Sequence, residues 1–146
     1  MIHQTINELP MQDFNKYMEI CETLARSAAS KGNSAVGSLI ILKNEIVAKA
    51  EEAVSTKQDV SCHAEMEVIR KAGKIIGKDM SQAILISTKE PCVMCSYAIR
   101  YHKIGYVVYK ERTEKLGGSN GYFNLLTSDM VPQEWGSPTI CFQLKP

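Results

Sequence analysis

The chain has 146 residues, of which 45% are hydrophobic and 23% charged, and 17 Lys and Arg against 16 Asp and Glu give a formal net charge of +1. These values are typical of a globular domain, so we expect a single domain over residues 1–146 and exclude a disordered, collagen-like or coiled-coil chain. No apolar run approaches the roughly 18 residues that span a bilayer, and the N-terminus lacks the pattern of a secretory signal. We therefore expect a cytoplasmic protein without a membrane segment, and the near-neutral charge gives no electrostatic case for nucleic-acid binding.

Hydrophobic periodicity and turn residues predict an alternation of helices and strands along the chain. Apolar residues at three- and four-residue steps, together with proline and glycine signals, predict helices over 10–31, 63–71, 91–102 and, more briefly, 122–126. Short apolar runs predict strands over 36–42, 46–50, 83–88, 105–109 and 139–144. The first two strands form a β-hairpin, and the polar stretch 55–61 is expected to be a loop.

The order of these elements predicts the fold class. A short helical crossover joins the third and fourth strands, which implies that these two strands are parallel, whereas the hairpin is antiparallel. The uninterrupted apolar run Ala83–Thr88 is typical of a strand that is covered on both faces. We therefore expect an α/β protein with three layers, α/β/α, around a mixed sheet of about five strands.

The five cysteines include one pair with C-x-x-C spacing, Cys92 and Cys95. Residues three apart project from the same side of a helix, and the first turn of a helix favours thiolate over thiol. His63 stands at the start of the preceding predicted helix. Two thiolates and one imidazole suit Zn2+, and three protein ligands leave the fourth position for water, as in catalytic zinc sites.

Glu65 is the predicted proton carrier because it lies in the same helical turn as His63. Two thiolates nearly cancel the charge of the zinc ion, so the metal acidifies water less than it would in an all-histidine site and a nearby base is needed. Side chains in the first helical turn tilt toward the N-terminus, which directs both residues into one pocket. Hydrolytic deamination requires one group that takes a proton from water and delivers it to the ring and the leaving amine.

The combined pattern His63-x-Glu65 and Pro91-Cys92-x-x-Cys95 resembles the signature of the zinc-dependent cytidine deaminase superfamily. Within it, the segments CHAEMEVIRKAG and STKEPCVMCSYAIRYHKIGYVVY look like the branch of tRNA adenosine deaminases, guanine deaminases and yeast-type cytosine deaminases. The resemblance implies a cytidine-deaminase-like fold, zinc ligation by His63, Cys92 and Cys95, and a proton shuttle at Glu65. It also implies a homodimer.

The resemblance places substrate contacts at the backbone of Ala64 and in the hairpin that precedes it. Many members of this branch carry an Asn about eleven residues before the ligand histidine, and counting back from His63 gives Glu52, which follows Glu51. An amide donates and accepts hydrogen bonds, whereas a carboxylate only accepts them. Glu52 therefore favours a substrate rich in N–H groups, such as an aminopurine, isocytosine or triazine. The alternative is that both acids only solvate the end of a strand.

Two simpler interpretations of the cysteines are a closed structural zinc site with Cys62 as fourth ligand and a dithiol redox pair. Adjacent side chains on an extended segment point apart, which disfavours joint ligation by Cys62 and His63, and the redox pair leaves Glu65 unexplained.

We therefore expect a zinc-dependent hydrolase that deaminates a small heterocycle, such as guanine, cytosine, a nucleoside or a related ring, and releases ammonia. The alternative is a tRNA-specific adenosine deaminase, which the near-neutral charge and Glu52 disfavour. A non-enzymatic relative is a third hypothesis, disfavoured by the presence of Glu65.

Overall fold

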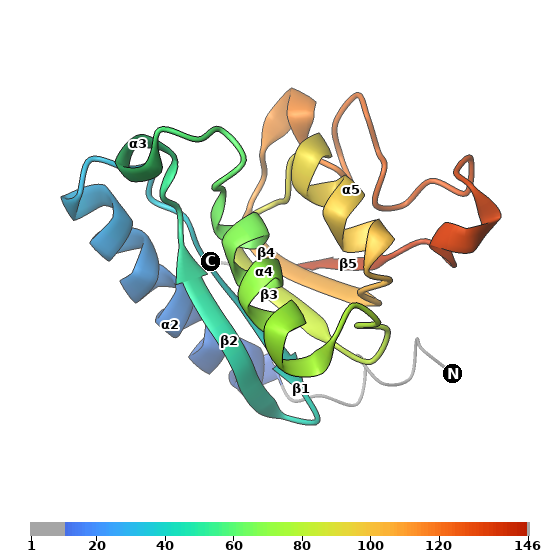
Figure 1. Cartoon of the computed structure of the whole chain (residues 1–146), viewed down its shortest axis with the longest axis horizontal. Helices are drawn as coiled ribbons and strands as arrows, with labels where there is room; N and C mark the ends of the chain where they lie inside the picture. Colours follow the sequence, from blue (N-terminus) through green and yellow to red (C-terminus); the bar gives the residue numbers. More distant parts are fainter. Residues whose placement is uncertain (1–10, 146) are drawn as a thin grey trace.

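The computed structural model describes residues 11–145, in which five strands form one mixed sheet between layers of helices (Figure 1). Pro10, the expected start of the first helix, lies outside the described residues. The α-helices are α2 (Met11–Ser30), α3 (Val54–Lys57), α4 (Ala64–Ile76) and α5 (Val93–Tyr101). The strands are β1 (Gly37–Leu42), β2 (Glu45–Glu51), β3 (Ile84–Lys89), β4 (Tyr106–Glu111) and β5 (Ile140–Gln143), and the 3-10 helices are η1 (Glu114–Leu116) and η2 (Gln133–Trp135).

The sheet has the strand order β2-β1-β3-β4-β5. β1 pairs antiparallel with both β2 and β3, whereas β3, β4 and β5 are parallel to one another. α2 covers one face of the sheet, and α4 and α5 lie on the other (Figure 1). The predicted three-layer arrangement, the mixed sheet and the parallel pairing of β3 with β4 are therefore confirmed.

Each face of the sheet has its own hydrophobic core. On one face, the apolar stripe of α2, which includes Phe14 and Met18, packs against strand residues such as Leu39. On the other face, apolar residues of α4 and α5 pack against β1, β3 and β4. α2 lies so close to β1 that a Cβ atom on Gly37 would be 2.1 Å from the carbonyl oxygen of Cys21, so a glycine is needed there.

Helix α4 is longer than the sequence predicted. It continues through Gly73, near which the end was expected, and stops at Ile76. A glycine inside a helix costs about 1 kcal/mol relative to alanine. The extension is favoured because Ile76 packs against the core that α4 covers. The helix ends instead at Gly77, whose φ of 81° is incompatible with a continuing right-handed helix.

Two expectations for the connecting segments were wrong. The short helix α3 begins just before the predicted loop 55–61 and occupies its first part. The predicted helix over 122–126 is absent, and the chain forms turns there. Arg100 on α5 donates hydrogen bonds to the carbonyl oxygens of Leu125 and Leu126, at 2.8 and 3.3 Å. These carbonyls are therefore held by a distant side chain, a constraint that local periodicity does not report.

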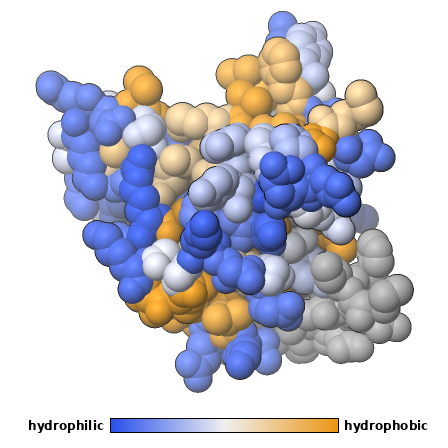
Figure 2. Space-filling view, turned by 45° about the vertical axis from the view of Figure 1, so that its right-hand side comes forward, coloured by the Kyte–Doolittle hydropathy of each residue, from blue (hydrophilic) through white to orange (hydrophobic). Residues whose placement is uncertain are grey.

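Most of the surface seen in Figure 2 is hydrophilic, with hydrophobic residues gathered near its upper and lower edges. Within residues 11–145, no helix combines the length and hydrophobicity needed to cross a bilayer. Several large exposed apolar side chains, including Tyr122, Phe123 and Met130, lie in the segment between β4 and β5.

Candidate metal centre and active site

The N-termini of α4 and α5 bring the three predicted zinc ligands together. His63 is the N-cap residue of α4, Cys92 is the N-cap residue of α5, and Cys95 lies in the first turn of α5. Each of the two cysteine sulfurs is 3.5 Å from Nδ1 of His63, and all three ligand atoms lie within 4.8 Å of one another. One nitrogen and two sulfurs at this spacing could hold one metal ion, and this donor set fits zinc.

The electrostatics of the cluster favour a thiolate at Cys92. Hydrogen bonds with Cys95 and then with His63 lower the pKa of Cys92 to about 4, although burial of the sulfur acts in the opposite direction. The same hydrogen bond raises the pKa of Cys95, which donates its proton, and contact with Cys92 raises the pKa of His63. The positive ends of two helices add to this preference for negative charge. Zinc binding would displace the remaining protons from the ligands.

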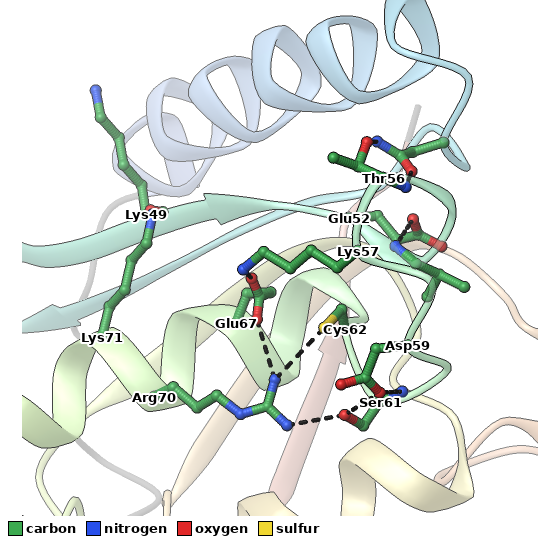
Figure 3. A network of polar contacts seen from close by, with 12 residues as sticks. Lys49, Glu52, Thr56, Lys57, Asp59, Ser61, Cys62, Glu67, Arg70 and Lys71 are labelled. Carbon is green, nitrogen blue, oxygen red and sulfur yellow. Dashed lines mark hydrogen bonds and ion pairs between the residues drawn. The ribbon is translucent and has the colours of Figure 1, made fainter.

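Cys62 does not complete a closed site with the three ligands. Its side chain is buried, and its sulfur is 3.9 Å from a guanidinium nitrogen of Arg70 on the outer side of α4 (Figure 3). The potential ligand cluster within residues 11–145 contains His63, Cys92 and Cys95 without it. The arrangement therefore supports the three-ligand site and not the closed site with Cys62.

Glu65 lies directly behind the ligand cluster. Its side chain is only 3% exposed, and its Oε1 atom is 3.8 Å from the sulfur of Cys95. Burial raises the pKa of the Glu65 carboxyl because the charged form loses its hydration. A carboxyl whose pKa is shifted toward neutrality, and which lies beside a metal site, is suited to both accept and donate a proton.

Two buried serines, neither of them predicted from the sequence, support Glu65. Ser87 on β3 donates a hydrogen bond of 3.1 Å to Oε2 of Glu65, and Ser38 on β1 donates one of 2.8 Å to Ser87. Both serines are fully buried. In the sequence, each serine is a polar residue within a mainly apolar predicted strand, which could have drawn attention to it. That the two serines contact each other is known only from the pairing of Ser38 with Ser87 across the sheet.

A cavity of about 160 Å³ lies next to the metal ligands. Glu52, Ala64 and Glu65, three of the candidate site residues, all line the cavity. Glu52 is 6% exposed and its Oε1 accepts a hydrogen bond of 2.9 Å from the backbone N–H of Val54 (Figure 3). It is therefore part of the cavity wall and does not solvate a strand end.

Glu51 is not brought to this cavity. Its carboxylate lies 3.2 Å from the ammonium group of Lys31, at the end of α2, and it lines a separate surface hollow. Glu52, which follows the end of β2, borders both the hollow and the cavity beside the metal ligands, whereas Glu51 borders only the hollow.

Several further cavity residues lie outside the zinc motif and were not predicted from the sequence. Lys89 and Glu90 directly precede the Pro-Cys segment, and Thr113 follows β4. Ser34 and Val36 come from the connection between α2 and β1. The proximity of Glu90 to the motif was a usable signal, but the position of Thr113 depends on how the chain folds back after β4.

Charged side chains of α4 bind residues of the segment 52–61, which begins with Glu52 (Figure 3). Both Lys57 on α3 and Arg70 on α4 hold the carboxylate of Glu67, the latter at 3.0 Å. Arg70 also donates a hydrogen bond of 3.0 Å to the hydroxyl of Ser61. These contacts connect the chain between Glu52 and His63 to the side of α4 that faces away from the metal ligands.

A three-layer α/β/α fold in which adjacent helix N-termini present His, Cys and Cys beside a buried Glu defines a zinc-dependent deaminase centre. The profile of the family described as "Cytidine and deoxycytidylate deaminase zinc-binding region" matches residues 11–111. The chain belongs to this family, as the motif predicted. It is an enzyme, a zinc-dependent hydrolase acting on the C–N bonds of cyclic amidines.

Similar proteins include the tRNA-specific adenosine deaminase of Aquifex aeolicus, which is 34% identical over 111 residues, covering 75% of this chain and 74% of that one. A structure from a study of A-to-I editing by tRNA:A34 deaminases superposes with a TM-score of 0.81 and 25% identity, covering 89% of this chain and 98% of that one. The guanine deaminase of Bacillus subtilis superposes with a TM-score of 0.64 and 31% identity, covering 67% and 64% of the two chains.

Proposed function

We propose that this deaminase acts on adenosine in tRNA, converting it to inosine with release of ammonia. The observation that carries the proposal is the similarity to tRNA:A34 deaminases, which extends over almost the full length of the superposed structure. The relative in Aquifex aeolicus, whose name specifies the same substrate, matches three quarters of the chain. This order of substrates reverses our expectation from the sequence, which placed a free heterocycle first.

In the proposed reaction, His63, Cys92 and Cys95 hold the zinc ion. When bound, zinc supplies a Lewis acid that lowers the pKa of water and stabilises developing negative charge. The Glu65 carboxylate accepts a proton from the attacking water and delivers it to the ring nitrogen. It then accepts the proton of the added hydroxyl group and delivers it to the amino group, which leaves as ammonia while the carbonyl forms. Ser87 keeps the Glu65 carboxylate oriented through its hydrogen bond of 3.1 Å.

Burial of the Glu65 carboxyl favours its role as a proton donor. It raises the pKa of Glu65, so the protonated form is accessible when the amine must leave. The wall formed by Glu52 and Ala64 would orient the ring against the ligand cluster.

A free heterocycle with ring N–H groups, such as guanine, is the second candidate. It is favoured by Glu52, whose carboxylate lines the cavity and accepts hydrogen bonds but cannot donate them when ionised. Guanine offers ring and amino N–H donors, whereas the ring nitrogens of adenosine are all acceptors apart from the glycosidic one. The similarity to the guanine deaminase of Bacillus subtilis is consistent with this second candidate.

The two candidates are separated by one screen with zinc-loaded protein. Ammonia release is measured with a tRNA transcript, adenosine, guanine, cytosine and isocytosine, and inosine in the tRNA is measured by mass spectrometry. The first candidate predicts inosine in the tRNA and little turnover of free bases. Turnover of guanine without tRNA editing would establish the second candidate instead. The variant Glu65→Ala is the control for contaminating deaminases.

A further inference from the structure

Glu90 is a buried carboxylate at the C-terminal end of β3, two residues before the metal-binding Cys92. Its side chain is 1% exposed. Its Oε2 atom accepts hydrogen bonds from the backbone N–H of Ser119 at 2.9 Å, from the hydroxyl of Ser119 at 2.6 Å and from the backbone N–H of Asn120 at 2.8 Å. Its Oε1 atom accepts one of 3.1 Å from the backbone N–H of Thr113. One side chain thus holds both ends of the segment 113–120.

The segment 113–120 is fitted closely around this carboxylate. A Cβ atom on Gly117 would lie 2.4 Å from Oε1 of Glu90, so a larger residue would displace the carboxylate. The neighbours of Glu90 hold the same segment through their backbones. The N–H of Gly118 donates to the carbonyl oxygen of Pro91 at 2.8 Å, and Cys92 forms an isolated β-bridge with Gly117.

The segment contributes to the wall of the cavity. Thr113 lines the cavity together with Glu90 and Cys92. The hydroxyl of Thr113 also donates a hydrogen bond to the carbonyl oxygen of Glu90. Both carboxylate oxygens of Glu90 accept hydrogen bonds from the segment, so they bind the protein itself and not a ring in the cavity.

We propose that Glu90 is a positioning residue that fastens the segment 113–120 beside the metal ligands and thereby fixes one wall of the substrate cavity. It acts on substrate binding and does not take part in the proton transfers assigned to Glu65. This inference goes beyond the choice of substrate, because the same wall would face adenosine in tRNA or a free base.

The variant Glu90→Gln tests this role because an amide replaces one of the two acceptor oxygens with N–H donors. Four hydrogen-bond donors contact the two carboxylate oxygens. In either orientation, the NH2 group of the amide would face at least one of these donors and could not accept its hydrogen bond. We expect KM for the best substrate of the screen to rise by about tenfold or more, the scale of one lost hydrogen bond to a charged group, while kcat changes by less than about threefold. Zinc content should be unchanged.

Ser119→Ala is the milder second variant, and Asp79→Asn is the matched control. Ser119→Ala removes the hydroxyl that donates to Glu90 and that also accepts a hydrogen bond of 3.1 Å from the side-chain amide of Asn120, but it keeps both backbone donors to Glu90. It tests the contact even if Glu90→Gln does not fold, and KM should rise by about threefold to tenfold. Asp79 also accepts a backbone N–H, from Ser81 at 3.1 Å, but it lies before β3, whereas Glu90 follows that strand. Its substitution should leave KM unchanged.

Hydrogen exchange gives a readout that does not depend on activity. The backbone N–H groups of Ser119 and Asn120 should exchange faster in Glu90→Gln than in the wild type. If the substrate screen finds no activity, faster exchange would still support the role of Glu90, although the proposed function would have failed. Unchanged KM and unchanged exchange in both variants would overturn the proposal. A fall in kcat with KM constant, or a loss of zinc, would also overturn it, because the residue would then act through the reacting centre.

Discussion

The variant Glu65→Ala separates metal binding from proton transfer. Glu65 is 3% exposed and its carboxylate is 3.8 Å from the sulfur of Cys95, but it belongs to none of the three ligand positions. Its removal should therefore leave the zinc content at one ion per chain. Turnover should fall because no other carboxylate of the cavity replaces it: Glu90 is held by its own partners and Glu52 lies on the wall.

The expected loss of activity follows from the two proton transfers assigned to Glu65. General acid–base catalysis by one positioned group contributes about 10²- to 10⁴-fold, or about 2.7 to 5.4 kcal/mol in activation free energy. Since the same carboxyl serves as base and then as acid, we expect kcat to fall by at least about 10³-fold. The assay is ammonia release under saturating substrate, with metal analysis of the same preparation.

Glu67→Ala is the matched control for this substitution. Glu67 lies two residues further along α4 and is also largely buried, but its carboxylate is held by Lys57 and Arg70 away from the cavity. This variant should lose stability and retain kcat within about threefold of the wild type. Ammonia release by Glu65→Ala within about tenfold of the wild type, with zinc present, would refute the proton-carrier role.

Four further predictions address the metal, the support of Glu65, the cavity wall and stability. Removal of zinc by a chelator should stop ammonia release, and added zinc should restore it. Ser87→Ala removes the hydroxyl that donates to Glu65, so kcat should fall by about tenfold with little change in KM in steady-state assays. Glu52→Asn introduces an N–H donor into the wall, so the ratio of turnover on adenosine to turnover on guanine should rise by about tenfold in paired assays. Burial alone would raise the pKa of Glu67, but hydrogen bonds from Lys57 and Arg70 outweigh it and hold the pKa below its ordinary value of 4.5. The stabilisation is therefore present above about pH 4.5 and lost as the pH falls below it, and denaturant unfolding of Glu67→Gln should show a shallower acid dependence.

The metal centre could be predicted from the sequence because each of its parts is local. His63 and Glu65 occupy one helical turn and Cys92 and Cys95 occupy another, and the two cysteines, three residues apart, project from one side of a helix. The cavity position of Glu52 was implied by the resemblance, because many members of that branch carry a base-contacting Asn at this distance before the ligand histidine. The resemblance to a family then supplied the knowledge that the two turns meet.

The rest of the site depends on contacts between segments that are distant in the chain. Ser38 meets Ser87 only because β1 pairs with β3, and the position of Thr113 depends on the carboxylate of Glu90. The missing helix over 122–126 has a similar cause, since hydrogen bonds from Arg100 on α5 hold the carbonyl oxygens of Leu125 and Leu126 in the observed turn. Local periodicity contains no information about such partners. The homodimer, the cytoplasmic location and the single-domain extent over residues 1–146 remain predictions.

X-ray absorption at the zinc edge tests the central claim most directly, because it reports the atoms that bind the metal. The account predicts one nitrogen at about 2.0 Å, two sulfurs at about 2.3 Å and one oxygen from a water molecule. His63→Ala should remove the nitrogen contribution, and Cys62→Ala should leave the spectrum unchanged. A third sulfur in the wild-type spectrum, lost in Cys62→Ala, would show a closed structural site and contradict the proposed deaminase centre.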